Sequence, residues 1–149
     1  MSMDKREVWL KATHDFANGF SSCPRKKFCA IIVDQDNQIV SLGYNGNLRG
    51  QCGDLCGGNS CLRDTLEIPS GEQTDVGCVH AEENAILNCA RQGVSCKDTT
   101  MYVNGEPCKK CAARIVQAGI KTVVYREGNY SPEGIEVLNT HGVVAVAIK

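Results

Sequence analysis

Residues 99–125 decide the fold, and they read TTMYVNGEPCKKCAARIVQAGIKTVVY. The apolar run Thr99–Val103 predicts a short strand, and Lys121–Tyr125 predicts a second one. Between them, Cys108–Ala118 predicts a helix, because a proline precedes it and a glycine follows it, as is typical of helix starts and ends. The stretch therefore predicts a strand, a helix and a strand in succession.

The same alternation continues on both sides of this stretch. Ala81–Arg91 predicts a helix that ends at Gly93. Downstream, Pro132–Thr140 predicts another helix and Val143–Ile148 a final strand. From residue 80 onward helices and strands alternate, and this order is typical of an α/β sheet with helices packed on its faces.

The first half of the chain adds a helix, a hairpin and a loop region. Asp4–Phe20 has apolar residues at helical spacing, and the apolar runs Phe28–Asp34 and Gln38–Gly43 predict a hairpin. Residues 44–79 are rich in glycine and contain four cysteines but few large apolar groups. We therefore expect a single domain over residues 1–149 with a Cys/Gly-rich insertion at about 47–78.

Composition narrows the class of protein. The 149 residues are 42% hydrophobic and 22% charged, which is typical of a soluble globular protein. A net charge of −1 gives no reason to expect a nucleic-acid partner. The charged start of the chain and the strand-length apolar runs favour no export signal and no membrane span. We therefore expect a cytoplasmic protein.

Ten cysteines are unusual for such a chain. Because cytosolic thiols are kept reduced, metal ligation is favoured over a disulfide framework. Two segments provide metal-ligand spacing, and they read His80-Ala81-Glu82-Glu83-Asn84 and Pro107-Cys108-Lys109-Lys110-Cys111.

Three side chains of these segments, His80, Cys108 and Cys111, form a candidate zinc site. A Cys-x-x-Cys pair and one histidine leave the fourth position of zinc open for water, as a catalytic site requires. The start of a helix lowers the pKa of a cysteine thiol there and favours the thiolate that zinc binds.

Glu82 is the candidate catalytic residue. We expect it on an inward stripe of its helix with Ile86, Cys89 and Ala90, whereas Glu83 points elsewhere. A buried carboxylate beside zinc can move protons between water and substrate. The Cys-x-x-Cys pair alone is also typical of a structural zinc knuckle or a redox pair. The combined order His-x-Glu and Pro-Cys-x-x-Cys matches the zinc deaminase signature.

The chain resembles the deoxycytidylate (dCMP) deaminases of the cytidine deaminase-like superfamily. Outside the zinc segments, the resemblance rests on Ser22-Cys23-Pro24-Arg25, Phe28–Val33, Gly43-Tyr44-Asn45-Gly46, Ile68-Pro69-Ser70-Gly71, Gln117-Ala118-Gly119-Ile120-Lys121 and Val123-Val124-Tyr125. Cys29 stands where relatives often have glycine, and Leu48 where many have proline.

The resemblance implies a three-layer α/β/α sandwich with a five-stranded mixed sheet. It also implies a homo-oligomer, often a hexamer, that converts dCMP to dUMP and ammonia. Asn45 would contact the deoxyribose, and the backbone around Ala81 would read the pyrimidine edge. The candidate substrate-binding residues are Ser22, Arg25, Lys26, Asn45, Ala81 and Tyr125. Ser22, Arg25 and Lys26 provide a plausible phosphate site, although such residues are equally typical of a solvated turn.

Many relatives are activated by dCTP and inhibited by dTTP, each with Mg²⁺. The resemblance places the effector near the loop Gly46–Gly50, where the candidate residues are Gly46, Asn47 and Arg49. Glycines at both ends of this loop let the backbone approach a ligand closely.

A second zinc site is a further expectation. Some relatives bind zinc at positions matching Cys23, Cys52 and Cys78, with a fourth ligand that we assign to Cys61 and alternatively to Cys56. A loop-rich insertion with little apolar mass needs such a crosslink. The alternative is that these cysteines are small buried apolar groups, the role we assign to Cys89 and Cys96.

Three other functions remain as alternatives. A nucleic-acid deaminase shares the zinc motifs but needs a basic face. A free-nucleoside deaminase has no use for a phosphate site, and a structural zinc module that binds a protein partner has no use for Glu82.

Overall fold

The computed structural model describes residues 4–49, 61–69 and 77–149. Its elements, in chain order, are α1 (Lys5–Phe20), β1 (Cys29–Val33), β2 (Ile39–Tyr44), α2 (Leu62–Thr65), α3 (Ala81–Gln92), β3 (Thr100–Val103), α4 (Lys109–Ala118), β4 (Thr122–Arg126), α5 (Glu133–Thr140) and β5 (Val144–Ile148). Every helix and strand expected from the sequence is present, with ends that differ by at most one residue. The short α2 was not expected.

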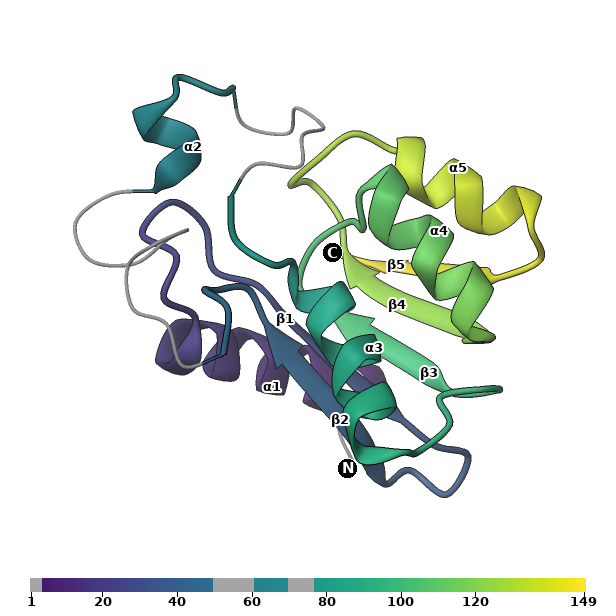
Figure 1. Ribbon diagram of the computed structural model, residues 1–149. Coiled ribbons are helices and arrows are strands. Elements are labelled where there is room, and N and C mark those ends of the chain that lie inside the picture. Colours follow the sequence, from purple (N-terminus) through teal and green to yellow (C-terminus); the bar gives the residue numbers. More distant parts are fainter. Residues whose placement is uncertain (1–3, 50–60, 70–76) are drawn as a thin grey trace.

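The five strands form one mixed sheet in the order β2-β1-β3-β4-β5. β1 pairs antiparallel with both β2 and β3, whereas β3, β4 and β5 run parallel. α1 covers one face of the sheet, and α3, α4 and α5 cover the other (Figure 1). The expected three-layer α/β/α sandwich with a five-stranded mixed sheet is therefore confirmed.

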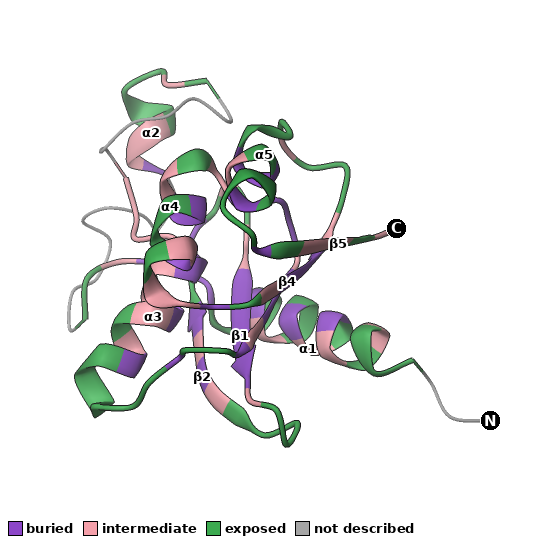
Figure 2. Ribbon diagram, turned by 90° about the vertical axis from the view of Figure 1, so that its right-hand side faces the viewer, coloured by how far each residue is buried: buried purple, intermediate pink, exposed green. Residues whose placement is uncertain are grey.

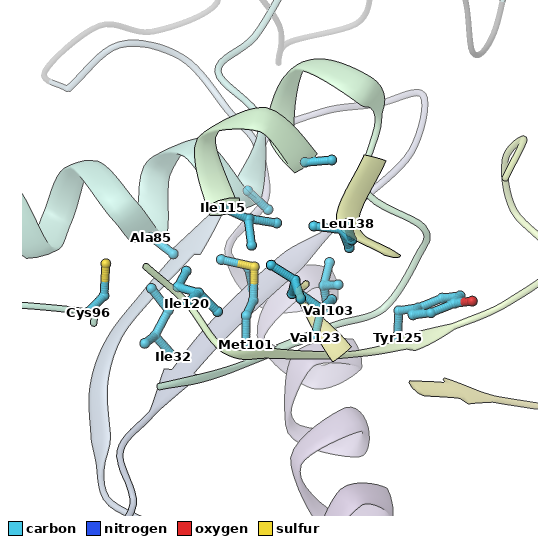
Figure 3. Packing of buried hydrophobic residues seen from close by; sticks show 14 of the residues in the cluster. Ile32, Ala85, Cys96, Met101, Val103, Ile115, Ile120, Val123, Tyr125 and Leu138 are labelled. Atoms are coloured by element: carbon cyan, nitrogen blue, oxygen red, sulfur yellow. The ribbon is translucent and has the colours of Figure 1, made fainter. Parts of the chain in front are cut away.

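The sheet separates two apolar cores. β1 is buried at all of its positions, because helices cover both of its faces (Figure 2). The larger core lies under α3, α4 and α5, where Met101 and Val123 of the sheet meet Ile115 and Leu138 of the helices (Figure 3). The smaller core lies under α1 around Leu10.

The ends of the helices follow from local sequence. α3 and α4 end at Gly93 and Gly119, both in the left-handed conformation that suits glycine as a helix cap. His80 and Cys108 are the N-terminal caps of α3 and α4, so both lie where unpaired backbone N–H groups gather. Within the described residues, no helix combines the length and apolar character needed to cross a membrane.

Candidate active site

The N-termini of α3 and α4 bring three potential metal ligands together. His80 caps α3, Cys108 caps α4, and Cys111 lies in the first turn of α4. The His80 Nδ1 atom lies 3.6 Å from the Cys108 Sγ and 3.4 Å from the Cys111 Sγ. Among the described residues, this is the one group of three or more metal-binding side chains whose ligand atoms lie within 4.8 Å of one another.

These distances fit zinc. Tetrahedral zinc with ordinary Zn–N and Zn–S bond lengths holds its nitrogen and sulfur ligands about 3.6 Å apart. One imidazole and two cysteine sulfurs are also a donor set that zinc prefers over magnesium or calcium. The three residues therefore fit a zinc ion with one coordination position left for another ligand.

Contacts within the site favour the thiolate form of Cys108. The Cys108 Sγ accepts a hydrogen bond from the backbone N–H of Cys111 at 3.4 Å. Its pKa is lowered to about 3, chiefly by a hydrogen bond with the Cys111 thiol, while that same contact and burial raise the pKa of Cys111. These contacts favour the thiolate of Cys108, which is the form of cysteine that zinc binds.

Glu82 is buried directly beside the three ligands. Only 6% of its surface is exposed, and burial raises the pKa of its carboxyl to about 7, although His80 opposes this rise. A carboxyl with a pKa near neutrality can both accept and donate a proton at physiological pH. Glu83 is turned away and pairs with Arg114 at 3.0 Å.

The inward direction expected for Glu82 agrees with the structure, but the expected stripe needs a correction. The buried residues of α3 are Ala81, Glu82, Ala85 and Cys89. Ala90 was expected on this stripe and is exposed. The face of α3 that packs on the sheet passes through Ala85, because β2 and β1 lie on that side.

One cavity, the catalytic cavity, opens over His80, Glu82 and Cys108. Four of the expected substrate-binding residues line it, namely Arg25, Lys26, Asn45 and Ala81. Ser22 and Tyr125 are not among its lining residues. Tyr125 is buried at the edge of the larger core instead (Figure 3), which leaves its expected substrate contact without support from this geometry.

Comparison with known proteins gives the family. A sequence model described as the cytidine and deoxycytidylate deaminase zinc-binding region matches residues 3–127. The chain belongs to this deaminase family.

Relatives of this deaminase-family chain include ComE operon protein 2 of Bacillus subtilis, which is 40% identical over 110 residues. That match covers 72% of this chain and 51% of the relative. The Homo sapiens deoxycytidylate deaminase is 37% identical over 136 residues, covering 87% and 72% of the two chains. This chain spans about half the length of the first curated relatives that it matches.

A solved structure of dCMP deaminase from the cyanophage S-TIM5, in complex with dCMP and dUMP, has a similar fold. Its TM-score is 0.75 and its identity 28%, and the match covers 99% of each chain.

Asn45 organises the wall of the catalytic cavity that precedes β1. It is 6% exposed, and its Oδ1 accepts a hydrogen bond from the backbone N–H of Phe28 at 2.9 Å. Its Nδ2 donates to the carbonyl oxygen of Lys26 at 2.8 Å. Asn45 thus fixes the backbone on both sides of Lys27, and its contact with a deoxyribose stays a prediction.

The expected effector loop lies beside α3. Arg49 donates a hydrogen bond from Nη2 to the Asn88 Oδ1 at 2.8 Å, and Asn88 donates to the carbonyl oxygen of Leu42 at 2.9 Å. Leu48 is 57% exposed. These contacts connect the loop to both β2 and α3, and its nucleotide-binding role stays a prediction.

Three of the cysteines expected at a second zinc site cluster together. Cys23 and Cys61 pack together, Cys78 packs against this pair, and all three line the catalytic cavity, but their sulfur atoms do not all lie within 4.8 Å of one another. The pKa of Cys23 is lowered to about 5, chiefly by a hydrogen bond with Cys78, and backbone N–H groups of Lys26 and Arg25 contribute. Cys52 and Cys56 lie outside the described residues, whereas Cys89 and Cys96 are buried in the larger core as expected.

Several cavity residues were missed by the sequence reasoning. They include Phe28, Arg63, Glu106 and Tyr130. Arg63 lies on α2, within the insertion, and its neighbour Asp64 pairs with Arg25 at 3.3 Å. No periodic pattern or motif marks these residues, because their shared location arises from four separate segments of the fold.

Proposed function

We propose that this protein catalyses the hydrolytic deamination of dCMP to dUMP and ammonia. The observation that carries the proposal is the burial of Glu82 beside the zinc-fitting group of His80, Cys108 and Cys111. The catalytic cavity lies directly over both. Family membership and the S-TIM5 enzyme solved with dCMP and dUMP support the choice of reaction.

Each group has a defined task in this reaction. A bound zinc ion would supply Lewis-acid activation of water as the nucleophile at neutral pH. Glu82 would take a proton from that water, pass it to N3 of the cytosine ring and later deliver a proton to the departing amine. The raised pKa of Glu82, caused by burial, suits this exchange in both directions.

The charge of the cavity favours a nucleotide over a nucleoside. Arg25, Lys26 and Arg63 all line it, and guanidinium groups bind phosphate oxygens through paired hydrogen bonds. Arg25 already pairs with Asp64 at 3.3 Å, and a 5′-phosphate would add a second anionic group beside these three cations, which a free nucleoside lacks. The 5′-phosphate of dCMP is the group that we assign to them.

Ammonia release from dCMP, cytidine and a tRNA stem-loop tests the assignment. We expect turnover with dCMP and at least about 100-fold less with the other two substrates. Cytidine lacks the 5′-phosphate, and the tRNA stem-loop does not fit the cavity. Equal turnover of cytidine would refute the phosphate assignment. Release from the stem-loop alone would replace the proposal with a nucleic-acid deaminase.

The finer expectations from the sequence join this proposal. Cys23, Cys52, Cys61 and Cys78 would hold a second, structural zinc, with Cys56 as the alternative fourth ligand. The close packing of Cys23, Cys61 and Cys78 supports this site. We also propose activation by dCTP and inhibition by dTTP, each with Mg²⁺, through Gly46, Asn47 and Arg49.

Assembly and location complete the proposal. We propose a homo-oligomer, with a hexamer favoured, in the cytoplasm, as the resemblance to dCMP deaminases implies. The mass of the particle in solution, measured by light scattering at several concentrations, tests the oligomer. A monomer at all concentrations would refute it.

A further inference from the structure

The carboxylate of Glu106 binds a turn that lies far from it in the sequence. Glu106 follows β3, immediately precedes the zinc-site segment, and is 8% exposed. Its oxygens accept hydrogen bonds from the backbone N–H groups of Gly128 at 3.1 Å, Asn129 at 3.1 Å and Tyr130 at 3.2 Å. Three successive N–H groups therefore converge on one buried carboxylate, as in a backbone anion-binding nest.

Burying the Glu106 carboxylate would destabilise the fold if its oxygens had no hydrogen-bond donors. The three N–H groups of the turn are therefore required partners of this side chain. A buried carboxylate destabilises the fold when it lacks hydrogen bonds, whereas charged acceptors make strong ones. Gly128 has φ = +102°, a backbone conformation that residues with a side chain rarely adopt. The glycine lets the turn direct its N–H groups toward Glu106. The carboxylate and the glycine together fix the turn before α5.

The turn presents Tyr130 to the catalytic cavity. The Tyr130 ring packs against Phe28 with a centroid distance of 5.6 Å and an interplanar angle of 43°. The Nζ of Lys26 lies 4.5 Å from the centroid of the same ring. All three residues line the cavity, so Tyr130 stands between an aromatic wall and a cation.

The two residues before Glu106 position Phe28, the aromatic side chain that Tyr130 contacts. Asn104 accepts a hydrogen bond from the backbone N–H of Cys29 at 2.9 Å and donates one to the carbonyl oxygen of Lys27 at 3.1 Å. These bonds hold the backbone on both sides of Phe28. A Cβ on Gly105 would lie 2.6 Å from the Phe28 ring, so only glycine leaves room for it.

We propose that Glu106 is a positioning residue for substrate binding, which acts by holding Tyr130 against Phe28 and Lys26 on the wall of the catalytic cavity. The substrate is the nucleoside monophosphate of the proposed function, and this inference rests on that function. The segment Asn104-Gly105-Glu106 thus fixes both aromatic side chains, while the next residues provide the zinc ligands. Glu106 itself need not touch the substrate.

Steady-state kinetics of E106Q separate this role from general support of the zinc site. In E106Q an NH₂ group, which cannot accept hydrogen bonds, replaces one carboxylate oxygen, and the remaining amide oxygen is uncharged, so the turn that carries Tyr130 is held less firmly. We expect KM for dCMP to rise about 10-fold while kcat changes by less than about threefold. Zinc content should stay equal to that of the wild type.

Two further variants and one control complete the test. Y130A should raise KM by a similar factor, and the double variant E106Q/Y130A should be no worse than Y130A alone, because both changes remove one contact. G128A strains the turn but leaves the carboxylate in place, and it should also raise KM. E127Q changes a neighbouring exposed carboxylate, and its KM should match the wild type.

Hydrogen exchange adds a readout that does not depend on activity. Amides of residues 128–130 should exchange faster in E106Q than in E127Q. The positioning role would be overturned by unchanged exchange or an unchanged KM in E106Q. It would also be overturned if the KM effects multiply in the double variant, or if E106Q loses zinc and kcat in parallel. A wild-type protein inactive on dCMP would instead refute the proposed function and, with it, the substrate-binding part of this inference.

Discussion

Gly46 and Val79 exchange two backbone hydrogen bonds, with N···O distances of 3.2 and 3.0 Å. Val79 directly precedes His80, and Gly46 directly follows the cavity residue Asn45. The loop proposed to bind the effector is therefore joined by main-chain contacts to both sides of the catalytic cavity. A ligand bound to this loop would be connected to groups of the site through these main-chain contacts.

Nucleotide regulation should follow from this connection. Substrate curves measured with dCTP and Mg²⁺ should move to lower dCMP concentration, and those with dTTP and Mg²⁺ to higher. A coupling free energy of about 1–3 kcal/mol corresponds to about a 5- to 150-fold change in apparent affinity. R49A should lose the nucleotide response, whereas R91A, on the exposed end of α3, should keep it. Superimposable curves, with no nucleotide binding by calorimetry, would show an unregulated enzyme.

Replacing Glu82 by glutamine should stop catalysis without releasing zinc. The amide cannot move protons, and loss of a general acid/base typically lowers the rate by about 10²–10⁴-fold. The matched control is E83Q, which removes the partly exposed pair with Arg114 and should change the rate by less than about threefold. Metal analysis accompanies the rate measurement. Wild-type turnover by zinc-loaded E82Q would contradict the mechanism.

Local signals made most of the fold predictable from the sequence. The ends of α3 and α4 were marked by Gly93, Gly119 and Pro107, whose backbone preferences act within one helical turn. The zinc ligands lie in two short motifs, and the combined order of these motifs, which matches the zinc deaminase signature, indicates a shared site. The α2 helix was missed because four residues carry no measurable periodicity.

Contacts between distant segments were not predictable in the same way. The inward direction of Glu82 was expected, but Ala90 was placed on its stripe where Ala85 belongs, since the tilt of a helix on a sheet is set by tertiary packing. Phe28 and Tyr130 are separated by most of the chain, and only the order of the strands brings them together. The same holds for Glu106 and its turn.

Zinc analysis of the reduced protein should find about two ions per chain if the second cysteine site is closed. The double variant C52S/C78S should lose one of them, because two of the four proposed ligands are removed. The zinc of His80, Cys108 and Cys111 should remain. C96S, which changes a cysteine buried in the larger core, is the control and should keep both ions. About one ion per chain in fresh, unchelated wild type would refute the second site.

Gly134 offers a test of how α5 supports the zinc ligands. A Cβ at this position would overlap the carbonyl oxygen of Pro107 and lie 2.9 Å from the carbonyl carbon of Cys108. G134A must therefore push α5 away from the segment that carries Cys108. Such overpacking typically costs about 1–3 kcal/mol of the free energy of unfolding. We also expect weaker zinc binding, measured by competition with a chelator.

G19A is the matched control for G134A, because a Cβ at Gly19 would meet no atom within 4 Å. Gly19 is the penultimate residue of α1, where alanine fits without a clash, so the unfolding temperature of G19A should stay equal or rise. Thermal unfolding of both variants, with and without added zinc, measures the contrast. If G134A unfolds at the wild-type temperature and keeps its zinc affinity, α5 does not press on the Pro107–Cys108 backbone. Destabilisation of G134A with unchanged zinc affinity would limit the role of Gly134 to packing.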